Sequence, residues 1–338
     1  MEKKFRSSRK VRVLAPVVAA MAALSLAACG GSSDAGTASA GEDGGKSSIK
    51  LVVAPIHFET AYIAEKQGYF KDAGLDVEIV TGADPAANLA MAVSGEADIT
   101  TGSWISVATS ASKGVPVTVI SGNGIVDPDE ANSGVMVNPD SGIKTVADLK
   151  GKTIGVVGVK TGSDIPVLQA IEDAGLKMDD IKEVAIPYSG MQAAIEQHTV
   201  DAVVPADTYY HQMLDAGYKS IAHPVLDYQA NMPVTVWTAT KEWAAANPGT
   251  AEKFNEAMEK AQKFYSDKAN IDAVKAVTAE VNQVDVAKVN AANYVPVSVA
   301  VNTKTGQSGI DAMEHFGLVK DPVTAEELLW DKAPRASK

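Results

Sequence analysis

Short apolar runs alternate with amphipathic stretches along the chain from residue 49 onward. Residues 49–55 (IKLVVAP) are short and β-branched, and residues 75–80 (LDVEIV) alternate apolar and acidic positions, as a half-buried strand does. Residues 85–102 predict a helix that stops at Gly95, followed by a turn and a further strand. This alternation predicts an α/β fold in which helices cover a sheet.

The middle of the chain repeats this order. Residues 152–158 (KTIGVVG) predict a strand, residues 164–175 (DIPVLQAIEDAG) a helix and residues 181–187 (IKEVAIP) another strand. Residues 191–207 (MQAAIEQHTVDAVVPAD) then echo the helix, turn and strand of residues 85–102. The repetition predicts two similar α/β lobes.

Two extended apolar runs flank the second of these lobes, at residues 133–139 and 232–240. We predict that they are the two strands by which the chain crosses between lobes. Lobe 1 would then contain residues 49–136 and 238–338, and lobe 2 residues 137–237. The helical C-terminal region would return to pack on lobe 1. Because open α/β sheets bind ligands at the carboxyl ends of their strands, a cleft between the lobes is the expected binding site.

The first 48 residues do not share this pattern. Six basic residues precede an apolar segment at 13–28 that is too short to span a bilayer comfortably, and it ends in Leu-Ala-Ala-Cys at Cys29. This ending resembles the lipobox of bacterial lipoproteins. We predict a signal peptide over residues 1–28, a lipid on Cys29 and a flexible Gly/Ser-rich tether over residues 29–48. The protein would be anchored to the outer face of the cell membrane; the alternative is an unmodified cysteine after an ordinary cleaved signal.

Charge and cysteine content narrow the candidate chemistry. The formal net charge is −12 and residues 1–28 carry +5, so the remainder carries −17, which argues against a nucleic-acid partner. Arg335 is the only arginine after residue 28, so a bidentate guanidinium clamp for a carboxylate, sulfonate or phosphate is not expected. Cys29 is the only cysteine, which excludes an intrachain disulfide and a cysteine-rich metal site.

Three short motifs suggest a serine enzyme. Residues 110–113 fit S-x-x-K, residues 121–123 fit S-x-N and residues 160–162 fit K-T-G, which is the order in penicillin-binding proteins. However, Gly114 and Pro116 end the helix just where the nucleophile's helix should begin, and the K-T-G leads into a helix rather than lying on a strand. We therefore reject this interpretation.

No cofactor or metal is expected. The chain has neither G-x-G-x-x-G nor a P-loop sequence, and its five histidines are scattered without a cysteine partner or i, i+4 pairing.

Five segments together resemble a known family. They read GYFKDAGLDVEIV, SGEADITTG, GVPVTVISG, TVADLKGKTIGV and VDAVVPAD, and they resemble the nitrate/sulfonate/taurine/thiamine-precursor type of ABC-importer substrate-binding protein over residues 49–330. The resemblance implies a type II periplasmic-binding-protein fold, closure around a small ligand, and delivery to a membrane permease with its ATPase. It also implies a monomer without catalytic residues, although the fold is shared with pyrimidine-synthesis enzymes and sensory receptors.

Ten residues at predicted strand ends are candidates for ligand contact. They are His57, Phe58, Thr60, Ser103, Trp104, Asn123, Thr161, Ser163, Tyr188 and Asp207.

Several of these residues also have a purely structural interpretation. Thr60 is a possible N-cap with Phe58 packing beside it, Trp104 a possible core residue, and Asp207 a possible helix cap. Ser163 is expected to cap the helix after the K-T-G, with Asp164 in its first turn.

The family resemblance and the scarcity of arginine indicate the chemical class of the ligand but not its identity. The family allows nitrate, sulfonates, taurine, aromatic acids and pyrimidines. Because no arginine is available to neutralise Asp207, a carboxylate in the cleft favours a ligand with N–H or amine donors. We therefore expect an aromatic or heterocyclic molecule or a zwitterion rather than a bare inorganic anion.

Overall fold

The computed structural model describes residues 47–54, 57–82, 85–159, 161–291 and 294–336. The chain divides into two units, residues 1–44 and 45–338, and every described residue belongs to the second. The predicted signal peptide, Cys29 and the tether up to residue 46 lie outside the described residues. Within the described part, no helix is both long and apolar enough to cross a membrane.

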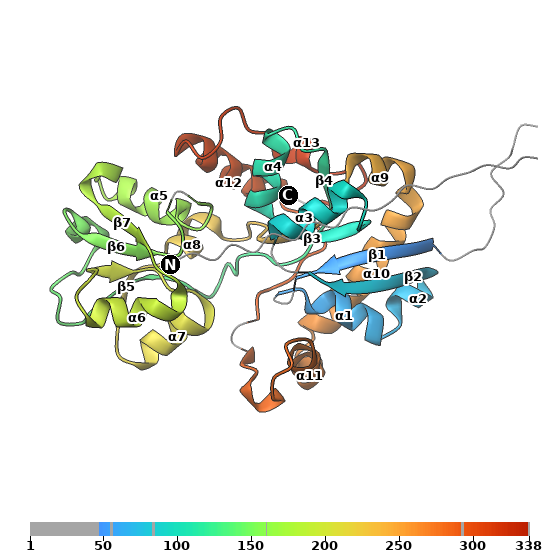
Figure 1. Ribbon diagram of the computed structural model, residues 1–338. Coiled ribbons are helices and arrows are strands. Elements are labelled where there is room, and N and C mark those ends of the chain that lie inside the picture. The colour runs from blue at the N-terminus through green and yellow to red at the C-terminus, as the bar shows by residue number, and fades with distance from the viewer. Residues whose placement is uncertain (1–46, 55–56, 83–84, 160, 292–293, 337–338) are drawn as a thin grey trace, which may run out of the picture. The chain divides into compact units, whose positions relative to one another are not determined.

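A first five-stranded sheet forms the centre of lobe 1 (Figure 1). Its order is β2 (Leu75–Thr81), β1 (Ser47–Val53), β3 (Ile99–Ser103), β10 (Thr235–Thr240) and β4 (Val117–Gly122). β1 runs parallel to β2 and β3, whereas β10 lies antiparallel between β3 and β4. Every residue of β4 is buried, including the polar Thr118 and Ser121, as is typical of a strand covered on both faces.

A second sheet with the same pattern forms lobe 2. Its order is β7 (Lys182–Ala185), β6 (Thr153–Val156), β8 (Ala202–Val203), β5 (Val135–Val137) and β9 (Lys219–Ala222). Here β6 is parallel to β7 and β8, and β5 lies antiparallel between β8 and β9. The α/β fold with two similar lobes that the sequence predicts is confirmed.

The crossings between the lobes differ from the prediction. β5 is bonded only within the second sheet and β10 only within the first, so the predicted limits at 136/137 and 237/238 fall inside strands. The chain passes between the sheets through residues 123–134 and 223–234, and the second passage contains α8 (Pro224–Gln229). An apolar run identifies a buried strand but not the sheet to which the strand belongs, which is why the two crossings were misplaced.

Helices cover both sheets. In lobe 1 they are α1 (Glu59–Lys66), α2 (Tyr69–Asp72), α3 (Pro85–Ser94), α4 (Trp104–Ser112), α9 (Lys241–Ala246), α10 (Pro248–Ser266), α11 (Ile271–Val281), α12 (Thr303–His315) and α13 (Ala325–Leu328). In lobe 2 they are α5 (Ile165–Asp173), α6 (Tyr188–Glu196) and α7 (Asp207–Asp215). Short 3-10 turns lie at Val146–Leu149, Met178–Asp180, Lys268–Asn270 and Val286–Lys288.

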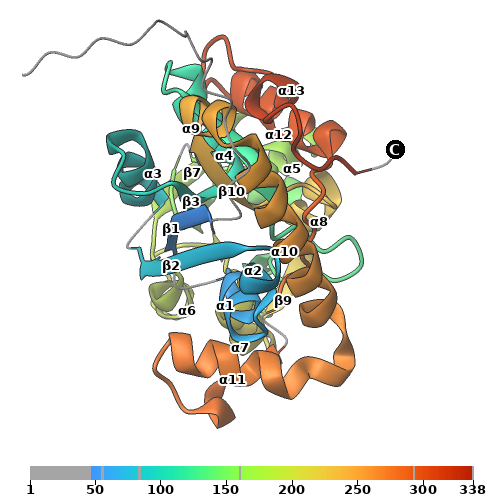
Figure 2. The same cartoon turned by 90° about the vertical axis from the view of Figure 1, so that its right-hand side faces the viewer.

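The long helix α10 shows how the sequence pattern becomes packing. Figure 2 shows it running beside α1 and α2 on lobe 1. Phe254, Met258 and Ala261 recur at helical spacing and are buried in one core cluster with strands of the first sheet.

The C-terminal region packs on lobe 1, as predicted. Val301, Ile310 and Met313 join Trp104 in one buried cluster. A connecting segment at 294–301 bonds to the end of β4: the backbone N–H of Gly122 donates to the Val299 carbonyl at 2.9 Å. This segment therefore covers part of the edge at which the strands of lobe 1 end.

Candidate functional site

A cavity of about 440 Å³ lies where the strands of both sheets end. Both lobes and both crossings contribute to its wall. Lobe 1 contributes Ser103, Ile105 and, at the start of β10, Thr235, and lobe 2 contributes Val204 and Asp207. The first crossing contributes Val126 and Asn132, and the second contributes Met232. A pocket of this size that is mostly apolar with a few polar groups suits a small organic molecule.

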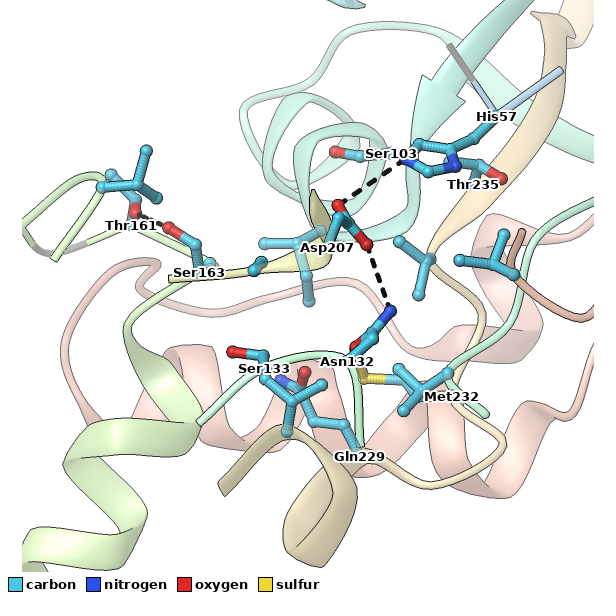
Figure 3. A pocket seen from close by; sticks show the side chains of 18 of the residues that line it. His57, Ser103, Asn132, Ser133, Thr161, Ser163, Asp207, Gln229, Met232 and Thr235 are labelled. Atoms are coloured by element: carbon cyan, nitrogen blue, oxygen red, sulfur yellow. Dashed lines mark hydrogen bonds and ion pairs between the residues drawn. The ribbon is translucent and has the colours of Figure 1, made fainter. Parts of the chain in front are cut away.

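Asp207 is the one carboxylate among the described residues that line the cavity, and those residues include no lysine or arginine. In Figure 3 its side chain lies between His57 and Asn132. The Asn132 amide donates to Asp207 Oδ1 at 3.3 Å, and Asp207 Oδ2 is 3.9 Å from His57 Nε2. Burial raises the pKa of the Asp207 carboxyl, while His57 and His211 act in the opposite direction.

Two residues at this point have left-handed backbone conformations. His57 has φ +63° and Asp207 φ +50°, although neither is glycine, and each such position costs about 1–3 kcal/mol. The Asp207 backbone N–H donates to the Asn132 carbonyl at 2.8 Å, which holds the start of α7 against the first crossing. Strain held by its surroundings at facing residues of two lobes is typical of a functional site.

Asn123 supports the turn that carries His57. Its side-chain amide donates to the His57 carbonyl at 2.7 Å and to Thr235 Oγ1 at 2.9 Å, and it accepts from Thr60 Oγ1 at 2.7 Å. Asn123 is 3% exposed and Thr60 2% exposed. Both therefore act through His57 and do not line the cavity.

Tyr188 contributes the aromatic surface of the cavity. It is the first residue of α6, and its ring stacks with Tyr209 at a centroid distance of 6.2 Å. Burial raises the pKa of the Tyr188 hydroxyl and the Asp207 carboxylate raises it further, so the phenol stays neutral and can donate a hydrogen bond.

The loop after β6 brings hydroxyl groups to the cavity. The Thr161 and Ser163 hydroxyls are 2.7 Å apart, and Thr161 Oγ1 donates to the Gly158 carbonyl. Helix α5 begins at Ile165 with Asp164 at its N-cap, so the predicted N-cap at Ser163 is wrong by one residue. Asp164 is fully buried and accepts from the Thr161 N–H at 2.9 Å, a bond that orders the loop and fixes the register of the helix.

The glycine of the K-T-G sequence lies where the two lobes meet. A Cβ at Gly162 would come within 2.5 Å of Ile105 Cγ2, which belongs to α4 of lobe 1. Close approach of two lobes is thus the reason for a small residue here, whereas Lys160 lies outside the described residues.

Six of the ten predicted residues line the cavity. They are His57, Ser103, Thr161, Ser163, Tyr188 and Asp207.

The other four predicted residues do not line it. Phe58 is 5% exposed and packs edge-on against Trp237, with the ring centroids 5.0 Å apart. Trp104 is a core residue and not a ligand contact: it is fully buried and its indole N–H donates to the Gly306 carbonyl at 3.0 Å. Thr60 is not an N-cap, because α1 begins at Glu59 after Phe58.

Sequence reasoning missed polar residues of the two crossings and of the strand that follows the second one. Asn132, Ser133 and Gln229 of the crossings and Thr235 at the start of β10 all line the cavity. Their polarity next to two predicted crossings is a usable signal, but it becomes meaningful only when the crossings are known to border the site. In the described part of the chain, no group of three or more His, Cys, Asp or Glu side chains could hold a metal ion.

Three curated relatives with different descriptions match part of this chain. "Putative thiamine biosynthesis protein" of Haemophilus influenzae is 32% identical over 43% of this chain and 44% of its own length. "Putative aliphatic sulfonates-binding protein" of Escherichia coli is 30% identical over 40% of this chain and 42% of its own length. The 4-amino-5-hydroxymethyl-2-methylpyrimidine phosphate synthase of Candida albicans is 27% identical over 62% of this chain and 64% of its own length. The chain thus spans less than half of the first two relatives and less than two thirds of the third.

Solved structures agree on the fold. The periplasmic aliphatic sulphonate binding protein SsuA from Escherichia coli superposes with a TM-score of 0.71 at 19% identity, over 85% of this chain and 98% of its own. The periplasmic nitrate-binding protein NrtA from Synechocystis gives a TM-score of 0.59 at 14% identity, over 81% and 83%. These similarities identify the architecture as the type II periplasmic-binding-protein fold.

The family is shown by a profile that extends over most of the described chain. The model described as NMT1/THI5 like matches residues 56–270, which include the second sheet, every strand of the first sheet except β1, and all ten residues predicted for ligand contact. This protein belongs to the NMT1/THI5-like family.

Proposed function

We propose that this protein captures a small organic molecule outside the cytoplasm and delivers it to an ABC importer. The observation that carries the proposal is the cavity itself, because its wall comes from both lobes and from both crossings. A ligand held there is enclosed only when the lobes are together, and separation of the lobes releases it. Hinge bending at the two crossings is the motion that this arrangement supports.

Contacts across the two lobes support closure. Ile165 and Leu168 of α5 share a buried cluster with Trp104 and Val107 of lobe 1. At the surface, Nε2 of His315 in α12 lies 2.8 Å from Oε2 of Glu172 in α5. Separating the lobes would expose this apolar area, so bound ligand and apolar contact together favour the closed form.

The proposal extends to location and partners. A lipid on Cys29 would hold the protein at the outer face of the membrane, and residues 29–48 would serve as the tether. A permease with its ATPase would recognise the closed form of the monomer. Replacing Cys29 with serine should release the protein from the membrane fraction; retention of the C29S variant there would contradict the lipid anchor.

Binding is tested most simply by stabilisation. A ligand at 100 times its dissociation constant stabilises the native state by about 2.7 kcal/mol, which a thermal-shift screen detects. The panel should contain taurine, alkanesulfonates, nitrate, aromatic acids and pyrimidines, and hits should be confirmed by calorimetry. We expect saturable stabilisation by at least one class, and no stabilisation by any class would contradict the proposal.

An enzyme of the family is the alternative, because the pyrimidine phosphate synthase of Candida albicans matches more of this chain than the sulfonate-binding relative does. We propose that the chain makes and breaks no bond. Prolonged incubation of the purified protein with each confirmed ligand, followed by mass spectrometry, should return the ligand unchanged. Formation of product at a rate that depends on protein concentration would favour the enzyme.

A further inference from the structure

We infer that the ligand donates an N–H group to Asp207, and that Asp207 selects amines, amidines or amino-substituted heterocycles against anions such as sulfonates. The inference rests on the proposed function and names the substrate class of the same cavity.

The charges of the cavity wall favour an N–H donor over an anion. Asp207 faces the cavity, and the described lining residues provide no lysine or arginine to neutralise it. An anion placed beside this carboxylate would be repelled in a partly desolvated site, whereas an N–H donor would gain a charge-assisted hydrogen bond. Among the lining residues that the structure describes, His57 is the one group that can balance the charge when it is protonated.

The geometry of the Asp207 carboxylate leaves one of its oxygens able to accept a hydrogen bond from a ligand. Asp207 Oδ1 accepts from Asn132, while Oδ2 lies 3.9 Å from His57 Nε2, which is too long for a hydrogen bond. The side chain is 35% exposed, so Oδ2 keeps room for a donor. Asp207 is the first residue of α7 and its backbone N–H donates to the Asn132 carbonyl at 2.8 Å, so the backbone that carries this carboxylate is held in place.

Two helices of lobe 2 begin at the cavity with a carboxylate at the N-terminus. The N-terminus of a helix favours a negative charge, and α5 and α7 both begin at this wall. Each already has a carboxylate of the chain itself at that end, Asp164 at α5 and Asp207 at α7. The N-terminal positions of α5 and α7 that an incoming anion would use are therefore occupied, whereas α6, which begins at Tyr188, has no acidic residue in its first turn.

The remaining wall indicates the shape of the ligand. Tyr188 offers an aromatic face beside Asp207, and Val126, Val204 and Met232 add apolar surface. A small planar molecule with an amino group satisfies both the ring and the carboxylate.

The test compares probes that share one frame and differ in charge. Benzylamine and 4-aminopyrimidine present N–H donors, and benzoate and benzenesulfonate present anions on a ring of similar size. Calorimetry on the purified full chain should give measurable binding for at least one N–H donor and at least tenfold weaker binding for both anions. Asp207→Asn should weaken binding of the N–H donor at least tenfold.

Asp215→Asn is the matched control, because Asp215 is an exposed carboxylate at the far end of the same helix. It should leave binding unchanged. Lys160 precedes Thr161 and lies outside the described residues, so Lys160→Gln tests whether a cation at that position binds an anion.

The outcomes separate the two proposals. If benzenesulfonate or ethanesulfonate binds and the N–H donors do not, the inference is overturned while the proposed function stands. Loss of that anion binding in the K160Q variant would strengthen this result. If no probe and no member of the wider panel binds, the proposed function fails and the inference fails with it.

Discussion

The two lobes contribute to the cavity in different ways. All four predicted residues of lobe 2, Thr161, Ser163, Tyr188 and Asp207, line it directly. Of the six predicted in lobe 1, only His57 and Ser103 do, and Trp104 is one of the four that lie in the core or support the wall from behind.

The C-terminal region explains this difference. In lobe 1, the segment at 294–301 and helix α12 pack over the ends of β3 and β4: Ser298 N–H donates to the Asn123 carbonyl at 2.6 Å, and the Trp104 indole N–H donates to Gly306. No C-terminal segment has these contacts with the described strand ends of lobe 2. The same strand-end position therefore lies in the core in one lobe and lines the cavity in the other.

The largest expected effect concerns the aromatic residue of each lobe. Trp104→Ala removes a fully buried indole and its hydrogen bond, and the loss of unfolding free energy should be about 3–5 kcal/mol. Tyr188→Ala removes a half-buried ring at the cavity, and it should cost less than half as much stability but abolish ligand binding. Denaturant unfolding and calorimetry measure the two quantities, and equal losses of stability would remove the distinction between the lobes.

The next largest expected effect is the loss of stability when either of two asparagines that bond to cavity-lining residues is replaced. Asn123→Ala removes the bonds of the Asn123 side chain to the Thr60 hydroxyl and the His57 carbonyl, and leaves the Thr235 hydroxyl with the Gly124 N–H, which should cost about 1–3 kcal/mol of unfolding free energy. Asn132→Ala, the matched control in the first crossing, removes one side-chain bond at 3.3 Å to a half-exposed carboxylate. Denaturant unfolding should show the smaller loss for N132A, and the reverse order would contradict the supporting role of Asn123.

A third effect lies where the lobes touch. Gly162→Ala places a methyl group against Ile105, so the closed form should be disfavoured and ligand affinity should fall by about tenfold, or 1.4 kcal/mol. Adding Ile105→Ala makes room for the methyl group and should restore much of the affinity. If the double variant binds no better than G162A, contact between the lobes is not the reason for the glycine.

The smallest effect is a pH dependence at Asp207. Its folded-state pKa is raised by burial, so the native state binds the proton more tightly than the unfolded state does, and stability falls as pH rises from the unfolded value toward the folded one. Asp207→Asn should therefore be slightly more stable than the wild type at neutral pH and equal to it in acid. A variant that is less stable at neutral pH would show that His57 and Asn132 more than offset the burial of the carboxylate.

The sequence predicts the features of the molecule that depend on local patterns and misses those that depend on contacts between distant residues. Periodicity and the repeated order of elements were sufficient for two similar α/β lobes, because these signals are local. The contacts of Trp104 with Gly306 and of Asn123 with His57 join residues 202 and 66 positions apart, and no local pattern contains them. Asp207 was predicted to face the cavity because it comes shortly after an apolar strand pattern, four residues past the end of β8 at Val203, whereas Asn132 was missed because it belongs to a crossing whose limits depend on strand pairing.

The most direct test of the account is a crystal structure of the protein with a calorimetrically confirmed ligand. We predict that the ligand lies between the two lobes, within hydrogen-bonding distance of Asp207 and in contact with Tyr188, and that Trp104 and Phe58 remain buried without touching it. A ligand bound elsewhere, or bound in this cavity against Trp104 with Asp207 turned away, would contradict the account.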